Sequence, residues 1–100
     1  MNQERFHNQL ALHLGYKRIL DKRMNIRIDE KREDPIVIIA GINTNQMLSF
    51  YASEEIETIW SKDITEEQKE AIQEMGAEKE IDAIISAVHQ AYIDANTNRF

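Results

Sequence analysis

The sequence predicts an α+β fold, in which a three-stranded antiparallel meander has helices packed on one face, in the order α-β-β-β-α-α-α. Apolar residues near both ends of the chain recur every three or four positions, as they do in amphipathic helices. The middle of the chain instead alternates in polarity or concentrates β-branched residues, and short connections there favour antiparallel neighbours. A length of 100 residues suits a single domain, residues 1–100.

The first predicted helix covers residues 2–14 or more. Its core face repeats every four residues and consists of Phe6, Leu10 and Leu14. Gly15 can end this helix as a left-handed cap, or the helix can continue to about Arg23. The longer helix has a second apolar stripe, made of Leu12, Tyr16 and Ile19. A helix that is apolar on two sides needs a second surface to pack against, which a second subunit would provide.

Three strands are predicted in the middle of the chain. Residues 24–29 alternate apolar and polar side chains, as a half-buried strand does. Residues 35–40 form a continuous β-branched run, which fits a central strand covered on both faces. The polar residues 30–34 predict a turn, and residues 41–45 contain the Gly and Asn typical of a hairpin before a third strand over residues 46–51.

The helix after the third strand is predicted to begin at Ser53, a residue type preferred at N-caps. Ile56, Ile59 and Trp60 then share one helical face. The aromatic residues fit a core better than a ligand site. Trp60 is also a candidate interface residue, because tryptophan is frequent at binding hot spots.

Two further helices are predicted on either side of Gly76. Thr65 and Gln68 form a capping-box pattern, and Gly76 is a typical stop. At about 100° per residue, the apolar residues before and after Gly76 point about 110–140° apart. One straight helix therefore cannot direct both groups of apolar residues into the same core. We therefore expect a break there and a last helix over residues 77–95. An alanine stripe on that helix, at every fourth position, permits close packing within the domain or across a dimer.

No catalytic or metal-binding motif is visible. The absence of cysteine excludes thiolate catalysis, disulfides and Cys-ligated zinc. His7 and His13 are six residues apart, whereas helical metal pairs are three or four apart. The three glycines form no phosphate-binding loop, and no serine lies in a nucleophile elbow. We expect a protein that is not an enzyme and uses no cofactor or metal.

The lack of cysteine and of a visible signal peptide favours a reducing compartment, and we expect a cytoplasmic protein. The longest apolar run, residues 36–42, is too short to span a bilayer.

The charges are divided unevenly along the chain, whose net charge is −6. Residues 1–32 hold eight Lys and Arg against four Asp and Glu, and residues 33–100 hold four against fourteen. The candidate anion-binding or nucleic-acid-binding residues are Lys17, Arg18, Lys22, Arg23, Arg27, Lys31 and Arg32. Interleaved acids and an isoelectric point near 5.0 instead favour a solvated surface with local salt bridges.

The order of the first five elements, α-β-β-β-α, resembles that of the double-stranded-RNA-binding domain. That family has a lysine-rich start to its last helix. Residues 77–81 read Ala-Glu-Lys-Glu-Ile here, which is acidic on balance. The resemblance is therefore one of element order alone, and it implies no function.

An acidic series with a spacing of four begins at Glu66 and predicts either a solvated helix face or a surface for a basic partner. The candidate protein-interface residues are Leu12, Tyr16, Ile19, Trp60, Glu66, Glu70 and Glu74.

Together these features predict a small acidic interaction module that binds another protein, as a regulator or inhibitor of the kind found among bacterial and phage accessory proteins. The most direct partner is a second copy, whose basic half meets the acidic half of the first in a homodimer. The alternatives are a nucleic-acid-binding regulator that uses residues 17–32 and a binder of a small anionic ligand.

Overall fold

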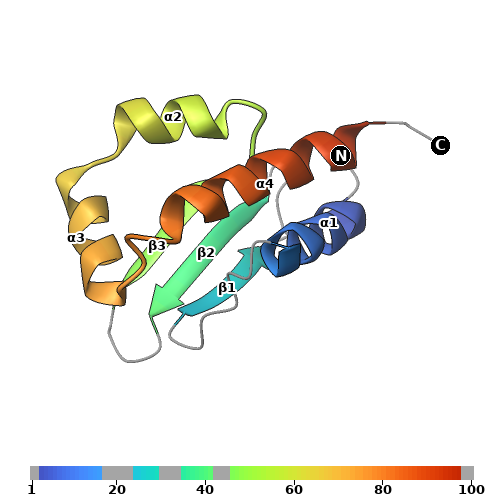
Figure 1. Cartoon of the computed structure of the whole chain (residues 1–100). Coiled ribbons are helices and arrows are strands. Elements are labelled where there is room, and N and C mark those ends of the chain that lie inside the picture. Colours follow the sequence, from blue (N-terminus) through green and yellow to red (C-terminus); the bar gives the residue numbers. More distant parts are fainter. Residues whose placement is uncertain (1–2, 17–23, 30–34, 42–45, 98–100) are drawn as a thin grey trace.

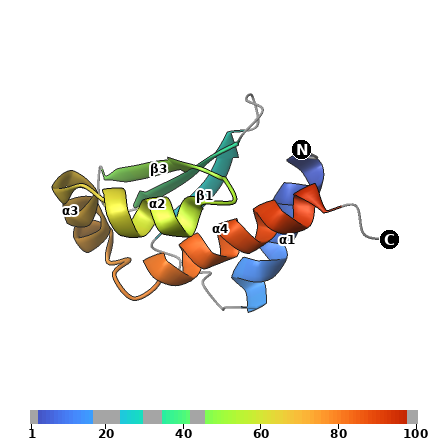
Figure 2. The same ribbon diagram turned by 90° about the horizontal axis from the view of Figure 1, so that it is seen from above.

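A computed structural model describes residues 3–16, 24–29, 35–41 and 46–97. The elements are α1 (Gln3–Tyr16), β1 (Met24–Asp29), β2 (Ile36–Gly41), β3 (Met47–Tyr51), α2 (Ile56–Asp63), α3 (Glu66–Met75) and α4 (Ile81–Asn96). The strands form one antiparallel sheet in the order β1-β2-β3. Helices α1, α2 and α4 lie on one side of this sheet, and α3 lies beside β3 (Figures 1 and 2). The predicted fold class and element order are confirmed.

The face of the sheet toward the helices is apolar throughout. Strand register aligns it in two rows, Ile26–Ile39–Leu48 and Ile28–Val37–Phe50. Because side chains alternate along a strand, the period-two pattern of β1 directs both of its isoleucines into the core. The largest fully buried side chains are Phe6, Leu10, Pro35, Val37, Ile39, Ile84 and Val88.

The described helices do not cover the second strand on both faces, contrary to the prediction from the sequence. Val37 and Ile39 are completely buried, whereas Ile36, Ile38 and Ala40 on the opposite face are only half-buried. The described helices pack on the first face alone (Figure 2). A run of β-branched residues is compatible with one or two covered faces, so it does not distinguish them.

The break at Gly76 is confirmed. The Thr65 hydroxyl accepts a hydrogen bond from the Gln68 amide at 3.1 Å, and the Gln68 side chain accepts one from the Thr65 amide at 2.9 Å. Gly76 has φ 69°, in the left-handed region, and its N–H donates to the Gln73 carbonyl at 3.1 Å. A turn over residues 77–80 follows, so α4 begins at Ile81, four residues later than predicted.

Two predicted helix ends differ from the structure. Gly15 lies inside α1 and does not have the positive φ of a left-handed cap. The possible continuation to Arg23 lies outside the described residues, as do the predicted turn over residues 30–34 and most of the predicted hairpin. Ser53 does not cap α2, which begins at Ile56. The amide of Ile56 donates to the Ser53 carbonyl at 3.3 Å, so a turn separates Ser53 from the helix.

Helix α4 packs closely against α1 and crosses the covered face of the sheet (Figure 1). Ala87, Ala91 and Ala95 of its small-residue stripe are buried in the core of the chain. The stripe therefore serves packing within the domain. None of the described helices combines the length and the apolar character needed to cross a membrane.

Candidate interaction surface

The sheet face opposite α4 has no described element over it (Figure 2). Strand register and side-chain alternation place eight described residues there: Arg27, Asp29, Ile36, Ile38, Ala40, Met47, Ser49 and Tyr51. We call this set the open face. Met47 is 58% exposed and Tyr51 is 52% exposed, which makes them two of the most exposed large apolar residues in the described part of the chain.

The open face combines an apolar centre with one charge of each sign. Arg27 is exposed and lies opposite Ile38 across the β1–β2 ladder, while the half-buried Asp29 lies opposite Ile36. A hollow of about 270 Å³ is lined by Arg27, Ile28, Asp29 and Ile38. Such a surface can bind a partner that is apolar in its middle and charged at its margin.

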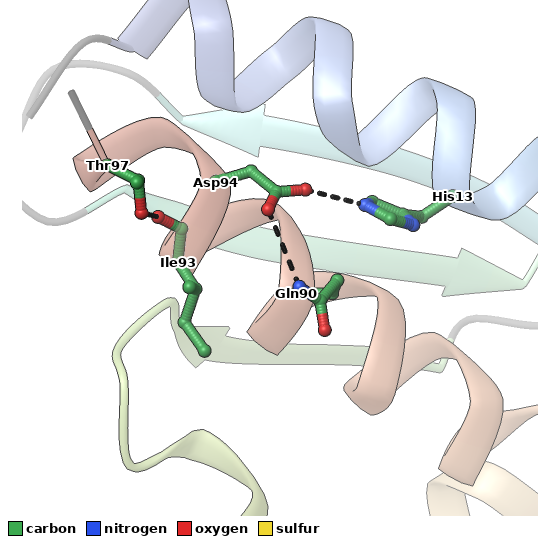
Figure 3. A network of polar contacts seen from close by, with 5 residues as sticks. All are labelled: His13, Gln90, Ile93, Asp94 and Thr97. Carbon is green, nitrogen blue, oxygen red and sulfur yellow. Dashed lines mark hydrogen bonds and ion pairs between the residues drawn. The ribbon is translucent and has the colours of Figure 1, made fainter. Parts of the chain in front are cut away.

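A second polar feature joins α1 to the end of α4 (Figure 3). His13 Nε2 lies 2.9 Å from Asp94 Oδ2, and Gln90 Nε2 donates to Asp94 Oδ1 at 3.4 Å. Next to this contact a groove of about 280 Å³ is lined by Arg5, Gln9, Gln90, Ile93, Asp94 and Thr97. The contact connects residues 81 positions apart, so no local pattern predicts it. It gives His13 a role in holding two helices together.

His89 also contacts an acid, because its Nδ1 lies 3.6 Å from Glu57 Oε1 between α4 and α2. Across the described residues, no group of three or more His, Asp or Glu side chains is placed to hold a metal ion.

Of the predicted basic cluster, the structure describes Arg27 alone, on β1. The other members lie outside the described residues: Lys17, Arg18, Lys22, Arg23, Lys31 and Arg32. Whether the cluster forms one phosphate-binding surface therefore stays a prediction.

The described members of the predicted interface set lie on different parts of the molecule. Leu12 is 49% exposed on α1, whereas Glu66, Glu70 and Glu74 are exposed on α3, at the opposite end of the molecule (Figure 1). Trp60 is half-buried, and its ring centroid lies 6.1 Å from that of Phe50, so it packs on the core. The side chain of Tyr16, and Ile19 as a whole, lie outside the described residues.

Sequence reasoning missed the open face. Exposed apolar residues at alternate positions of the third strand, Met47 and Tyr51, were the available signal. No protein-family model, curated protein or solved structure matches this chain. Function is therefore inferred from the surfaces of the molecule.

Proposed function

We propose that this chain is a non-enzymatic interaction module that acts by binding protein, and that it forms a homodimer through the open face. The observation that carries this proposal is the combination, on that face, of exposed apolar residues with oppositely charged side chains two positions apart on β1. The large exposed side chains support an interface, because burying an apolar surface of this kind is favourable.

The order of residues on the open face is self-complementary. The face has one row made of Arg27, Ile38 and Ser49 and another made of Asp29, Ile36 and Tyr51. A two-fold axis that runs across the strands, midway between these rows, exchanges the two rows. Arg27 then lies opposite the partner's Asp29, and Ile38 lies opposite the partner's Ile36. Sheets packed face to face are rotated by about 30°, which displaces residues on a neighbouring strand by only about 2.5 Å. An arginine side chain is long enough to span that displacement.

The size of the face predicts a weak dimer. Three strands about 4.8 Å apart and six residues long make a surface of about 14 by 20 Å. That is about 280 Å² for each subunit, well below the roughly 800 Å² of a standard stable interface. We therefore expect reversible association with a dissociation constant in the micromolar range or weaker.

Sedimentation velocity over a concentration series, combined with charge reversal, tests this arrangement. Arg27→Glu places two acids against each other at both symmetry-related contacts between β1 and the partner's β1, and Asp29→Arg places two arginines there. Each variant should dimerise at least about fivefold more weakly than the wild type, because like charges replace two exposed pairs. An equimolar mixture of the two variants should associate again, since the glutamate introduced in one chain then meets the arginine introduced in the other. Lys79→Glu, an equal charge change at an exposed position in the turn before α4, is the matched control.

A wild-type chain that stays monomeric at all concentrations would refute the dimer. If the single variants associate as the wild type does, a dimer exists but another surface forms it. Failure of the mixture to recover association would exclude the proposed two-fold axis.

The more detailed predictions, a regulator or inhibitor from a bacterium or phage and a cytoplasmic location, stay predictions. So do the two alternatives, nucleic-acid binding and binding of a small anion, because both depend mostly on basic residues outside the described part of the chain.

A further inference from the structure

Strand β3 is at the edge of the sheet. It pairs with β2 on one side and with no other strand in the described part of the chain. Two backbone hydrogen bonds at the ends of the β2–β3 ladder show which backbone groups of β3 face β2. The Ala52 amide donates to the Pro35 carbonyl at 2.9 Å, and the Gly41 amide donates to the Gln46 carbonyl at 3.1 Å.

These two bonds define which residues of β3 direct their backbone toward β2. In an antiparallel pair, hydrogen-bonded and non-hydrogen-bonded pairs alternate. Leu48 and Phe50 therefore bond to β2, whereas Met47 and Ser49 at the alternate positions direct their N–H and C=O groups to the free edge. No hydrogen bond from these outward groups is seen within the described residues. An edge of this kind is a template for another strand.

A groove of about 370 Å³ runs along this edge, between β3 and the first turns of α3. Its lining residues are Gln46, Met47, Leu48 and Ser49 from the strand side, and Thr65, Glu67, Gln68 and Ala71 from the helix side. The four strand residues span about 13 Å, the length of about four residues of an extended chain. The groove thus has room for a short added strand next to the outward groups of Met47 and Ser49.

The groove is acidic on its helix side. The Thr65 hydroxyl and the Gln68 amide oxygen already accept hydrogen bonds within the capping box. The charged group in the lining is the carboxylate of Glu67. Glu70 is exposed on the same helix, whereas Glu66 is paired with Lys69 Nζ at 3.2 Å. An occupant with lysine or arginine side chains complements this charge.

We propose that the groove between β3 and α3 binds an extended basic segment of another protein, which adds a fourth strand to the sheet at the free edge of β3. The segment exchanges backbone hydrogen bonds with Met47 and Ser49, and its alternate side chains place a positive charge near Glu67. The groove uses the backbone edge of β3, whereas the dimer uses side chains of the open face, so Met47 and Ser49 contribute to the two surfaces through different groups. Binding of the segment therefore does not depend on the homodimer.

Fluorescence anisotropy with a labelled peptide tests the proposal. The probe has eight residues that alternate lysine with threonine or valine, and a second peptide has glutamate in place of lysine. Ser49→Pro removes the outward N–H without removing a hydrogen bond to β2, because proline is tolerated on edge strands where the N–H faces outward. Ser49→Ala keeps that N–H and is its matched control. Glu67→Lys reverses the charge in the groove, and Glu74→Lys makes the same change on α3 outside the groove lining.

The lysine peptide should bind the wild type, and the glutamate peptide should not. Ser49→Pro should weaken binding at least about fivefold through the lost hydrogen bond and the steric bulk of the ring, with Ser49→Ala unchanged. Glu67→Lys should weaken it about three- to tenfold, and Glu74→Lys should change it much less. The Arg27→Glu chain, which is expected to be monomeric, should bind the peptide as well as the wild type does.

No binding of the lysine peptide at low salt overturns the proposal. Equal binding by wild type and a folded Ser49→Pro variant also overturns it, because the attraction would then be electrostatic and unrelated to the strand edge. If circular dichroism shows that Ser49→Pro is unfolded, equal effects of Glu67→Lys and Glu74→Lys on peptide binding overturn the proposal instead. Self-association that is lost in Ser49→Pro but kept in both Ser49→Ala and Arg27→Glu would assign the edge to a second copy and overturn the basic segment.

Discussion

Two neighbouring isoleucines on β2 report directly on which face of the sheet is covered. Ile39 is completely buried between Ile26 and Leu48 in its cross-strand row, and Ile38 is half-buried on the open face. Replacing each with alanine removes the same three carbon atoms from the same strand. The burial of each site therefore decides the difference in the free energy of unfolding.

For Ile39→Ala, three buried carbon groups at about 0.8 kcal/mol each make a transfer loss of about 2.4 kcal/mol. The closed site adds a cavity cost, which brings the expected loss to about 3–4 kcal/mol. Ile38→Ala leaves no closed cavity, and because Ile38 is partly exposed it loses only about two-thirds to three-quarters of the transfer contribution, about 1.5–2 kcal/mol. For a domain of this size, the larger loss lowers the Tm by about 12–25 °C.

Urea unfolding followed by circular dichroism at low protein concentration measures both values, because dimer formation is then minimal. Ile39→Ala should be less stable than Ile38→Ala by at least about 1 kcal/mol. In sedimentation velocity the order should reverse, since Ile38→Ala removes apolar surface from the proposed interface. Equal losses of unfolding free energy would refute the inference that one face of the sheet is open.

Three more predictions concern stability. Gly76→Ala should destabilise the chain by about 1–2 kcal/mol, because φ 69° is unfavourable for a residue with a Cβ. Gly15→Ala should instead stabilise it by about 0.5 kcal/mol, since Gly15 is helical and an added Cβ meets no atom within 4 Å. Urea unfolding measures both changes in the free energy of unfolding. Changes of the same sign would contradict the left-handed conformation of Gly76 or the helical conformation of Gly15. A double-mutant cycle of His13→Ala and Asp94→Ala should give a coupling of about 0.5–1 kcal/mol, because both side chains are partly exposed, and zero coupling would show that the contact does not stabilise the α1–α4 packing.

The elements that were predicted correctly are those whose signals are local. The Thr65–Gln68 capping box and the stop at Gly76 depend on residues within one or two helical turns, so their chemistry is complete in a short stretch of sequence. Ser53 shows the limit of this reasoning. A serine before a helix is compatible with a cap, but the turn from Ser53 to Ile56 delays the helix start. Propensity alone does not reveal such a turn.

The candidate sites were less predictable than the fold. The contact between His13 and Asp94 joins positions 81 residues apart, and only the packing of α1 on α4 brings them together. The groove beside β3 likewise requires α3 to return to the edge of a strand that precedes it in the chain (Figure 1). Neither arrangement has a periodic signal.

The sequence by itself determined the kinds of element and their order, because hydrophobic period and turn chemistry act over a few residues. Only the tertiary structure decided which face of β2 is covered, which edge of the sheet is free and which charges become neighbours. An alternating strand has the same pattern whether its second face meets water, another layer or a partner. That choice depends on where the helices pack, and in the described part of this chain they leave the face of Ile38, Met47 and Tyr51 open.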